Sequence, residues 1–135
     1  MGLILDSSVV IAAERAGQTA YQMVQTMGSD DTELALSVVT ILELAHGVAR
    51  ANTEARHTIR QRFLQDLLSG MPVHPVTVPI AMRAGHIDGL LRAQGLRVAL
   101  ADLLIGATAL ELGFSIVTNN VRHFEMIPAL EIRQR

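Results

Sequence analysis

The sequence predicts an α/β protein, an α/β/α sandwich in which helices cover both faces of a mainly parallel sheet. Two observations support this class. Short apolar runs of strand length alternate with longer segments of helical periodicity, and strands separated by helices pair in parallel. Half of the 135 residues are hydrophobic, which suffices for one core. We therefore expect a single domain over residues 1–135.

The first half of the chain contains two predicted strands. Residues 2–5 are a continuous apolar run, and residues 33–37 form a second run after a turn at Asp30 and Asp31. Elsewhere in this half the spacing of apolar residues is helical, with a break near Gly17. We expect helices at residues 7–14, 17–27, 38–50 and 53–69.

The second half continues the alternation. Two prolines bracket residues 72–76 and leave room for at most a short strand. Helical segments at residues 78–94 and 100–112 are each followed directly by a glycine, the residue that accepts a positive φ after a helix. Residues 114–118, Phe-Ser-Ile-Val-Thr, are typical of a strand.

The amino-acid composition excludes several kinds of functional site. The net charge of −2 does not favour nucleic-acid binding, yet all 11 basic residues are arginines, which donate bidentately to phosphate. A GC-rich genome would explain the same bias. The absence of cysteine excludes disulfides, thiolate metal sites and cysteine nucleophiles. The chain starts without a basic leader and has no uncharged apolar run of membrane length, so we expect a soluble, cytoplasmic protein.

Asp6 and Glu43 are the first candidate functional residues. Asp6 directly follows the first predicted strand, and functional sites gather at the carboxyl ends of parallel strands. Asp6 would alternatively only cap the next helix. Glu43 lies on a mostly polar helical face, so a solvent-facing glutamate is an equally simple interpretation. Gly47, one turn later, favours close approach of a backbone or substrate, because glycine inside a helix costs up to about 1 kcal/mol relative to alanine.

Asp102 is the carboxylate that most requires a partner. Its neighbours on the same helical face are small or apolar: Val98, Ala99, Ile105 and Gly106. Burying an unpaired carboxylate costs several kcal/mol. We therefore expect a cation, a donor or a helix N-terminus beside Asp102; capping of the helix at 100–112 is the alternative.

Thr118 ends the last predicted strand and Asn120 lies just after it, at the edge where Asp6 is expected, although both are also common turn formers. Carboxylates gathered at one edge repel each other unless a cation neutralises them. Without cysteine or paired histidines at metal spacing, the ligands suit Mg²⁺ or Mn²⁺ rather than Zn²⁺. Such an ion activates water and stabilises a phosphodiester under attack.

Four motifs occur in a specific order. They are Leu-Asp-Ser-Ser at 5–8, Ser-Val-Val-Thr-Ile-Leu-Glu-Leu-Ala-His-Gly at 37–47, Ala-Asp-Leu-Leu-Ile-Gly-Ala-Thr-Ala at 101–109 and Val-Thr-Asn-Asn-Val-Arg-His-Phe at 117–124. With these motifs the chain resembles the PIN domain, most of all the VapC-type toxins of bacterial toxin–antitoxin pairs. The resemblance covers almost the whole chain, including Phe124 and Pro128.

This resemblance implies a compact PIN fold and an Mg²⁺- or Mn²⁺-dependent endoribonuclease that hydrolyses RNA with metal-activated water. It also implies inhibition by a VapB-type antitoxin, and commonly a homodimer. The family's three acids fall on Asp6, Glu43 and Asp102 as catalytic residues, with Asp6 and Asp102 as metal ligands. Residues in supporting or substrate-positioning places are Ser8, Thr118, Asn120 and Arg122.

The chain departs from the family pattern at two positions. Asn120 stands where an aspartate is frequent, and His123 stands where another acidic residue is frequent. With one charge fewer, we expect one firmly held ion, and a second that arrives with the RNA. A catalytically inactive PIN-like module that binds RNA or protein is the alternative. Receiver domains and haloacid-dehalogenase-like phosphatases also place an aspartate after the first strand, but they need an active-site lysine, which this chain lacks.

The remaining expectations concern surfaces and packing. Arg97 and Arg122 are candidates for phosphate contacts, and Asp88 with Arg92 has the spacing of an exposed ion pair. The apolar excess predicts a covered surface, for which we expect the helices within 17–27 and 38–69 to contact an antitoxin or a second copy. The residues expected to fill the core as flexible side chains are Met23, Met27 and Met82.

Overall fold

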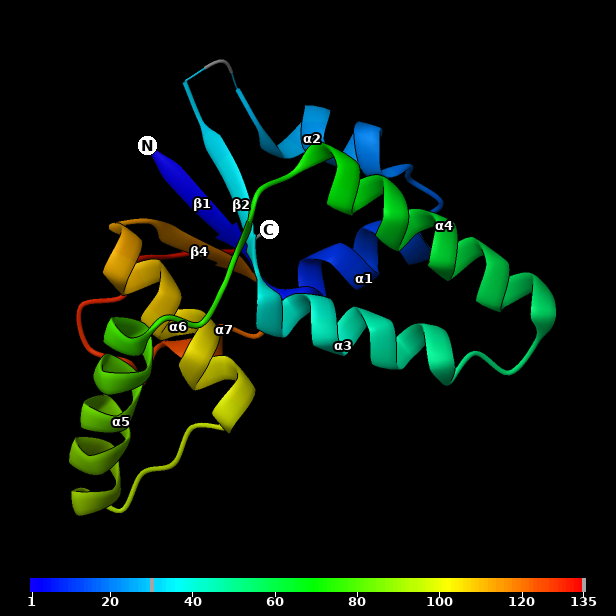
Figure 1. Ribbon diagram of the computed structural model, residues 1–135. Coiled ribbons are helices and arrows are strands. Elements are labelled where there is room, and N and C mark those ends of the chain that lie inside the picture. The colour runs from blue at the N-terminus through cyan, green and yellow to red at the C-terminus, as the bar shows by residue number, and fades with distance from the viewer. Residues whose placement is uncertain (30, 135) are drawn as a thin grey trace.

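The computed structural model describes residues 1–29 and 31–134 as a parallel sheet between helical layers (Figure 1). The strand order is β3-β2-β1-β4-β5, and all four neighbouring pairs are parallel. The predicted α/β/α class is therefore confirmed. The strands are β1 (Gly2–Leu5), β2 (Glu33–Ser37), β3 (Val73–His74), β4 (Ser115–Thr118) and β5 (Ile132–Gln134).

Helices connect the strands and cover both faces of the sheet. In Figure 1, α1, α2 and α4 lie on one side of the strands, and α5 and α6 lie on the other. The side chains of α3 pack into both layers, because Val39 joins one core cluster and Ile41 the other. The helices are α1 (Ser7–Arg15), α2 (Ala20–Met27), α3 (Val38–Ala49), α4 (Glu54–Gly70), α5 (Val78–Ala93), α6 (Leu100–Leu112) and α7 (Val121–Phe124).

The two faces of the sheet bury alternate residues of each strand. In β1, Leu3 and Leu5 pack against the layer that contains α1, α2 and α4. Ile4 points the other way and packs with residues of α5 and α6. Because every second residue of a strand faces the same side, a strand that is apolar throughout is buried on both faces, which is why its sequence is a continuous apolar run.

The second helix differs from its prediction. It begins at Ala20 rather than at residue 17, because the Thr19 side chain caps it and Gln22 bonds back to the Thr19 backbone. Gly17 lies outside this helix with a φ of +79°. A turn was also predicted at Asp30 and Asp31. Asp31 lies in a turn, whereas Asp30 lies outside the described residues.

The chain after residue 118 contains two elements that were not predicted, α7 and β5. The edge strand β5 is three residues long and two of its residues are polar, so its sequence carries no clear strand pattern. Phe124 and Ile127 anchor this segment in the core. A Cβ on Gly106 would lie 2.6 Å from Ile127 Cδ1. Gly106, one helical turn after Asp102, therefore leaves space for the Ile127 side chain and not for a substrate.

Other local predictions have mixed outcomes. Gly95 and Gly113 both have positive φ, as expected after a helix, and Arg92 pairs with Asp88. Met23 is buried and Met27 is partly buried in the core, but Met82 was wrongly assigned there. Its side chain is 70% exposed on the outer face of α5. None of the helices built from the described residues is long and apolar enough to cross a membrane.

Candidate active site

The candidate site lies where the strand order changes direction. The chain leaves the central strand β1 toward β2 on one side, while β4 lies on the other side. In open α/β sheets, ligands bind outside the carboxyl ends of the strands at such a point. Asp6 follows β1 and Thr118 ends β4, so the topology brings together two residues that are 112 positions apart.

Asp6 is held by hydroxyl groups. Its side chain is almost fully buried, and Oδ2 accepts hydrogen bonds from Ser8 Oγ at 2.7 Å and from Thr118 Oγ1 at 2.8 Å. Asp6 stands at the N-cap position of α1, but its side chain makes no capping hydrogen bond. The capping interpretation therefore does not explain this carboxylate, whereas Ser8 and Thr118 lie where they can fix its orientation.

Glu43 extends from the middle of α3 into the same region. Burial raises the pKa of its carboxyl above the ordinary value; the Ser7 side chain lowers it, and the charges of Asp6 and Asp102 raise it further. Oε1 is buried and has no hydrogen-bond partner within the described ranges. Glu43 is therefore not a simple solvent-facing glutamate, since its carboxylate lies near two other acids.

Asp102 lies in the first turn of α6 and has the partner that its apolar surroundings demand. Oδ2 is 3.1 Å from Nδ1 of His123 on α7. Burial and the Asp6 charge raise the pKa of Asp102, while the charge and hydrogen bond of His123 lower it. The N-cap residue of α6 is Ala99, and no side chain caps this helix, so capping does not account for Asp102 either.

The three predicted acids thus act on one another electrostatically. Among residues 1–29 and 31–134, however, no three acidic or histidine side chains are grouped closely enough to enclose a metal ion directly. The donor atoms at the site are carboxylate and hydroxyl oxygens, the kind of ligand that Mg²⁺ and Mn²⁺ prefer. Mg²⁺ keeps several water ligands and is commonly bound through one or two carboxylates together with substrate phosphates.

Two orphaned polar atoms support a polar ligand at this place. Thr40 Oγ1 and Glu43 Oε1 are both buried without a hydrogen-bond partner in the described part of the chain. The two residues are three positions apart on α3, which places them on one face of the helix. Because buried polar atoms are normally satisfied, these atoms favour water or a hydrated cation beside the acids.

The other predicted residues lie at the rim. The Asn120 side chain is exposed, and its backbone N–H donates to Thr118 Oγ1 at 2.9 Å. Arg122 is exposed on α7, and the described residues offer it no hydrogen-bond or ion-pair partner. Arg97 is also exposed, in the segment before α6. Each arginine is therefore available to an external anion, but neither touches the acids.

Sequence reasoning did not assign Ser7 or His123 to the site. Ser7 was named only within the Leu-Asp-Ser-Ser motif at 5–8, although its side chain acts on Glu43. His123 was noted only as a departure from the family pattern, although it contacts Asp102. The apolar neighbourhood of Asp102 was the available signal, since it required a partner without identifying one.

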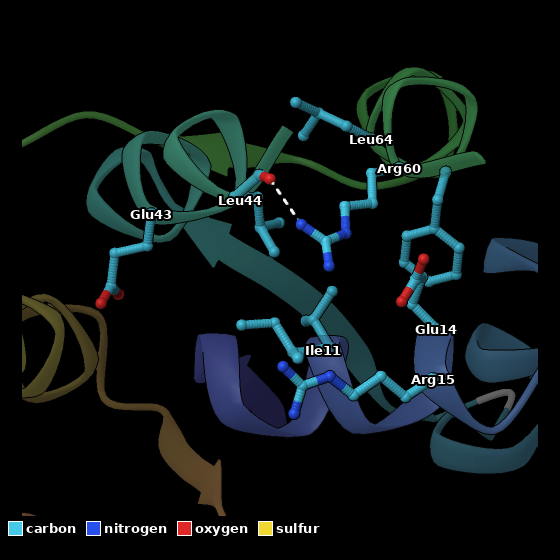
Figure 2. A pocket seen from close by; sticks show the side chains of 10 residues that line it. Ile11, Glu14, Arg15, Glu43, Leu44, Arg60 and Leu64 are labelled. Carbon is cyan, nitrogen blue, oxygen red and sulfur yellow. Dashed lines mark hydrogen bonds between the residues drawn. The ribbon is translucent and has the colours of Figure 1, made fainter. Parts of the chain in front are cut away.

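A cavity of about 100 Å³ lies between α1, α3 and α4, and Glu43 is the one of the three acids that lines it. Figure 2 shows Glu43 at one end and Glu14 at the other, with Arg60 between them. The guanidinium of Arg60 donates to the Gly47 carbonyl oxygen at 2.7 Å and so joins α4 to the end of α3. A Cβ on Gly47 would meet no atom within 4 Å. We call this cavity the groove between α1, α3 and α4. Most of the side chains that line it are apolar, namely Val10, Ile11, Leu44, Phe63 and Leu64.

Comparisons with known proteins agree with this geometry. The PIN domain family profile matches residues 3–129. Ribonuclease VapC1 of Rickettsia felis is 31% identical over 132 residues, which cover 98% of this chain and 95% of that protein. Ribonuclease VapC10 of Mycobacterium tuberculosis is 35% identical over 129 residues, which cover 96% and 90%.

A solved structure shows the same fold. The crystal structure of VapBC2 from Rickettsia felis, bound to a promoter DNA fragment, contains a chain with a TM-score of 0.87 and 23% identity. The match covers 100% of this chain and 99% of that chain. From the sheet order, the placement of its acids, and these matches, the chain belongs to the PIN domain family, among relatives that carry the VapC name.

Proposed function

We propose that this protein is an Mg²⁺- or Mn²⁺-dependent endoribonuclease and the toxin of a type II toxin–antitoxin system. The observation that carries the proposal is the meeting of Asp6, Glu43 and Asp102 at the switch point of a PIN-domain sheet. Curated relatives that match nearly the whole chain are named ribonucleases. The same acids, without a counter-ion, would only repel one another.

In this proposal the side chains have separate roles. Asp6 and Asp102 hold the divalent ion, and Glu43 orients the attacking water. Ser8 and Thr118 keep the Asp6 carboxylate in one orientation through their hydrogen bonds. Arg122 and Asn120, at the exposed start of α7, position the RNA backbone. When bound, Mg²⁺ or Mn²⁺ lowers the pKa of water and stabilises negative charge on the phosphate.

The direct test is cleavage of structured RNAs by the purified full-length protein. We expect cleavage in the presence of Mg²⁺ or Mn²⁺, and none after chelation with EDTA. Calorimetric titration with Mn²⁺, with and without RNA, distinguishes the enzyme from an inactive module. A protein that binds RNA with the same affinity whether or not Mn²⁺ is present, and never cleaves it, would establish the inactive PIN-like alternative.

A VapB-type antitoxin would occupy the groove between α1, α3 and α4. The groove offers apolar side chains to a partner segment and ends at Glu43. Because Glu43 has a raised pKa and an unpartnered oxygen, a lysine or arginine of that segment would stabilise its charge. Such a segment would cover apolar surface and block access to the acids at the same time.

We predict that Gly47→Gln abolishes antitoxin binding without unfolding the protein. The new side chain would enter the groove, and its Cβ has open space around it. It also replaces a glycine that costs the helix up to about 1 kcal/mol relative to alanine. Co-purification from the native host measures the effect, with Gly85→Gln as the matched control, since Gly85 lies in α5 with equally open space. If the wild type, Gly47→Gln and Gly85→Gln all recover the same small partner in equal amounts, the antitoxin does not bind in the groove.

We further predict a homodimer. Large apolar side chains are exposed on α2, α3 and α4, and also on α5 and α6, where Met82 and Leu100 are about 70% exposed. A second copy that covers such surface would stabilise both chains. Size-exclusion chromatography with light scattering should report twice the chain mass of 14.6 kDa. A single chain mass at micromolar concentration would contradict the prediction.

A further inference from the structure

His123 is the histidine that contacts an acid of the candidate site. Its side chain is 58% exposed, and Nδ1 lies 3.1 Å from Asp102 Oδ2. An ionised carboxylate only accepts hydrogen bonds, so Nδ1 carries the proton that is donated to Asp102. In the neutral ring, Nε2 then has no proton. Within the described residues, no other histidine forms an ion pair.

The backbone holds His123 in place from both sides. Its N–H donates to the Asn120 carbonyl oxygen at 3.0 Å, and the Asn120 N–H donates to Thr118 Oγ1 at 2.9 Å. Thr118 Oγ1 in turn donates to Asp6 at 2.8 Å. The next residue, Phe124, is fully buried and anchors α7 in the core. A continuous set of hydrogen bonds therefore connects Asp6 to the residue that contacts Asp102.

We propose that His123 is a positioning residue for the RNA cleavage proposed above, in which the ring donates to Asp102 Oδ2 and leaves Oδ1 for the divalent ion. The inference rests on that proposed function and adds to it. It assigns a role to a residue at which this chain lacks the acid that is frequent in its family. An imidazole there supplies a donor to the remaining acids instead of one more negative charge.

The contact with Asp102 sets the size of the expected effect. The Asp102 side chain is only 15% exposed, and its Oδ2 lies 3.1 Å from His123 Nδ1. A hydrogen bond to Oδ2 restricts the rotation of the carboxylate. Partners that hydrogen-bond to metal ligands commonly change metal affinity or activity by about 10- to 100-fold when they are removed. The same size of effect is expected here.

Three substitutions separate the two ring nitrogens. In His123→Asn the amide nitrogen lies close to the position of Nδ1, whereas in His123→Gln it lies close to that of Nε2; His123→Ala removes both. Mn²⁺ affinity of the full-length protein is measured by calorimetry without RNA, and kcat and KM are measured with a structured RNA. His86→Ala is the control, because His86 is exposed on α5 without an ion pair among the described residues.

We expect His123→Ala and His123→Gln to weaken Mn²⁺ binding by about 10- to 100-fold and to lower kcat with little change in KM. His123→Asn should retain most of both values, and the control should retain all of them. Unchanged Mn²⁺ affinity in His123→Ala would overturn the inference and leave the proposed function standing. Rescue by Gln but not Asn, with a raised KM in the Ala variant, would instead assign Nε2 to the RNA and also overturn it. A wild-type protein that neither binds Mn²⁺ nor cleaves RNA would overturn the proposed function itself.

Discussion

Replacing Asp6 or Asp102 with asparagine should lower the RNA cleavage rate at least about a thousandfold, a loss of ~4 kcal/mol in transition-state stabilisation. Asparagine removes the negative charge that the divalent ion requires. It keeps the size of the side chain and an oxygen that can accept the hydrogen bonds of Ser8 and Thr118 at position 6. Initial rates at saturating Mn²⁺, with circular dichroism of each variant, measure the effect.

Asp88→Asn is the matched control for these substitutions. Asp88 lies on α5 in an exposed ion pair with Arg92, and such pairs contribute about 0.2–1 kcal/mol to stability. Its variant should cleave RNA at the wild-type rate. If Asp6→Asn and Asp102→Asn also cleave at that rate, the acids are not the catalytic centre.

The second large effect concerns stability. Without a divalent ion, the folded state holds Glu43 and Asp102 at raised pKa values. The folded protein then binds more protons than the unfolded chain between the ordinary values, 4.5 and 3.8, and the raised ones. Stability therefore falls as pH rises through this window and stays lower above it. A bound Mn²⁺ should reverse the loss at neutral pH, by about 2.7 kcal/mol when its concentration is a hundred times Kd.

Thermal unfolding with and without Mn²⁺, at several pH values, measures this effect. We expect the rise in Tm on adding Mn²⁺ to be large at pH 7 and to disappear as pH falls below the ordinary pKa values of Glu43 and Asp102, where both carboxyls are protonated in the folded and unfolded states. Asp6→Asn should reduce the Mn²⁺-dependent rise. An equal rise in the variant would show that Mn²⁺ binds elsewhere on the protein.

The sequence predicted the fold well where the signal is local. The apolar run of β1 indicated burial on both faces, and the structure has this strand at the centre of the sheet. The start of α2 was placed too early, at residue 17. The helix begins after Thr19, because the capping box between Thr19 and Gln22 satisfies the backbone N–H groups at that position. The strand β5 was missed because it is short and mostly polar, so that only its pairing with β4 makes it a strand.

The sequence was enough to predict which acids form the candidate site, but not which side chains form hydrogen bonds with them. Asp6 and Thr118 were expected at one edge because Asp6 directly follows one strand of a parallel sheet and Thr118 ends another. Their direct hydrogen bond depends on the register of β1 beside β4. His123 reaches Asp102 only because α7 turns back over the start of α6, and no local pattern encodes that approach. Met82 was wrongly predicted in the core because an apolar residue on a helix can also face outward.

The central claim is that these acids direct water, with a divalent ion, to an RNA phosphodiester. Cleavage in ¹⁸O-labelled water, followed by mass spectrometry of the earliest products, tests it most directly. We predict one ¹⁸O atom in the new terminal phosphate, no 2′,3′-cyclic phosphate, and no product from Asp102→Asn or in EDTA. Early products that end in a 2′,3′-cyclic phosphate, formed equally in EDTA, would contradict the account, because the RNA 2′-hydroxyl would then be the nucleophile.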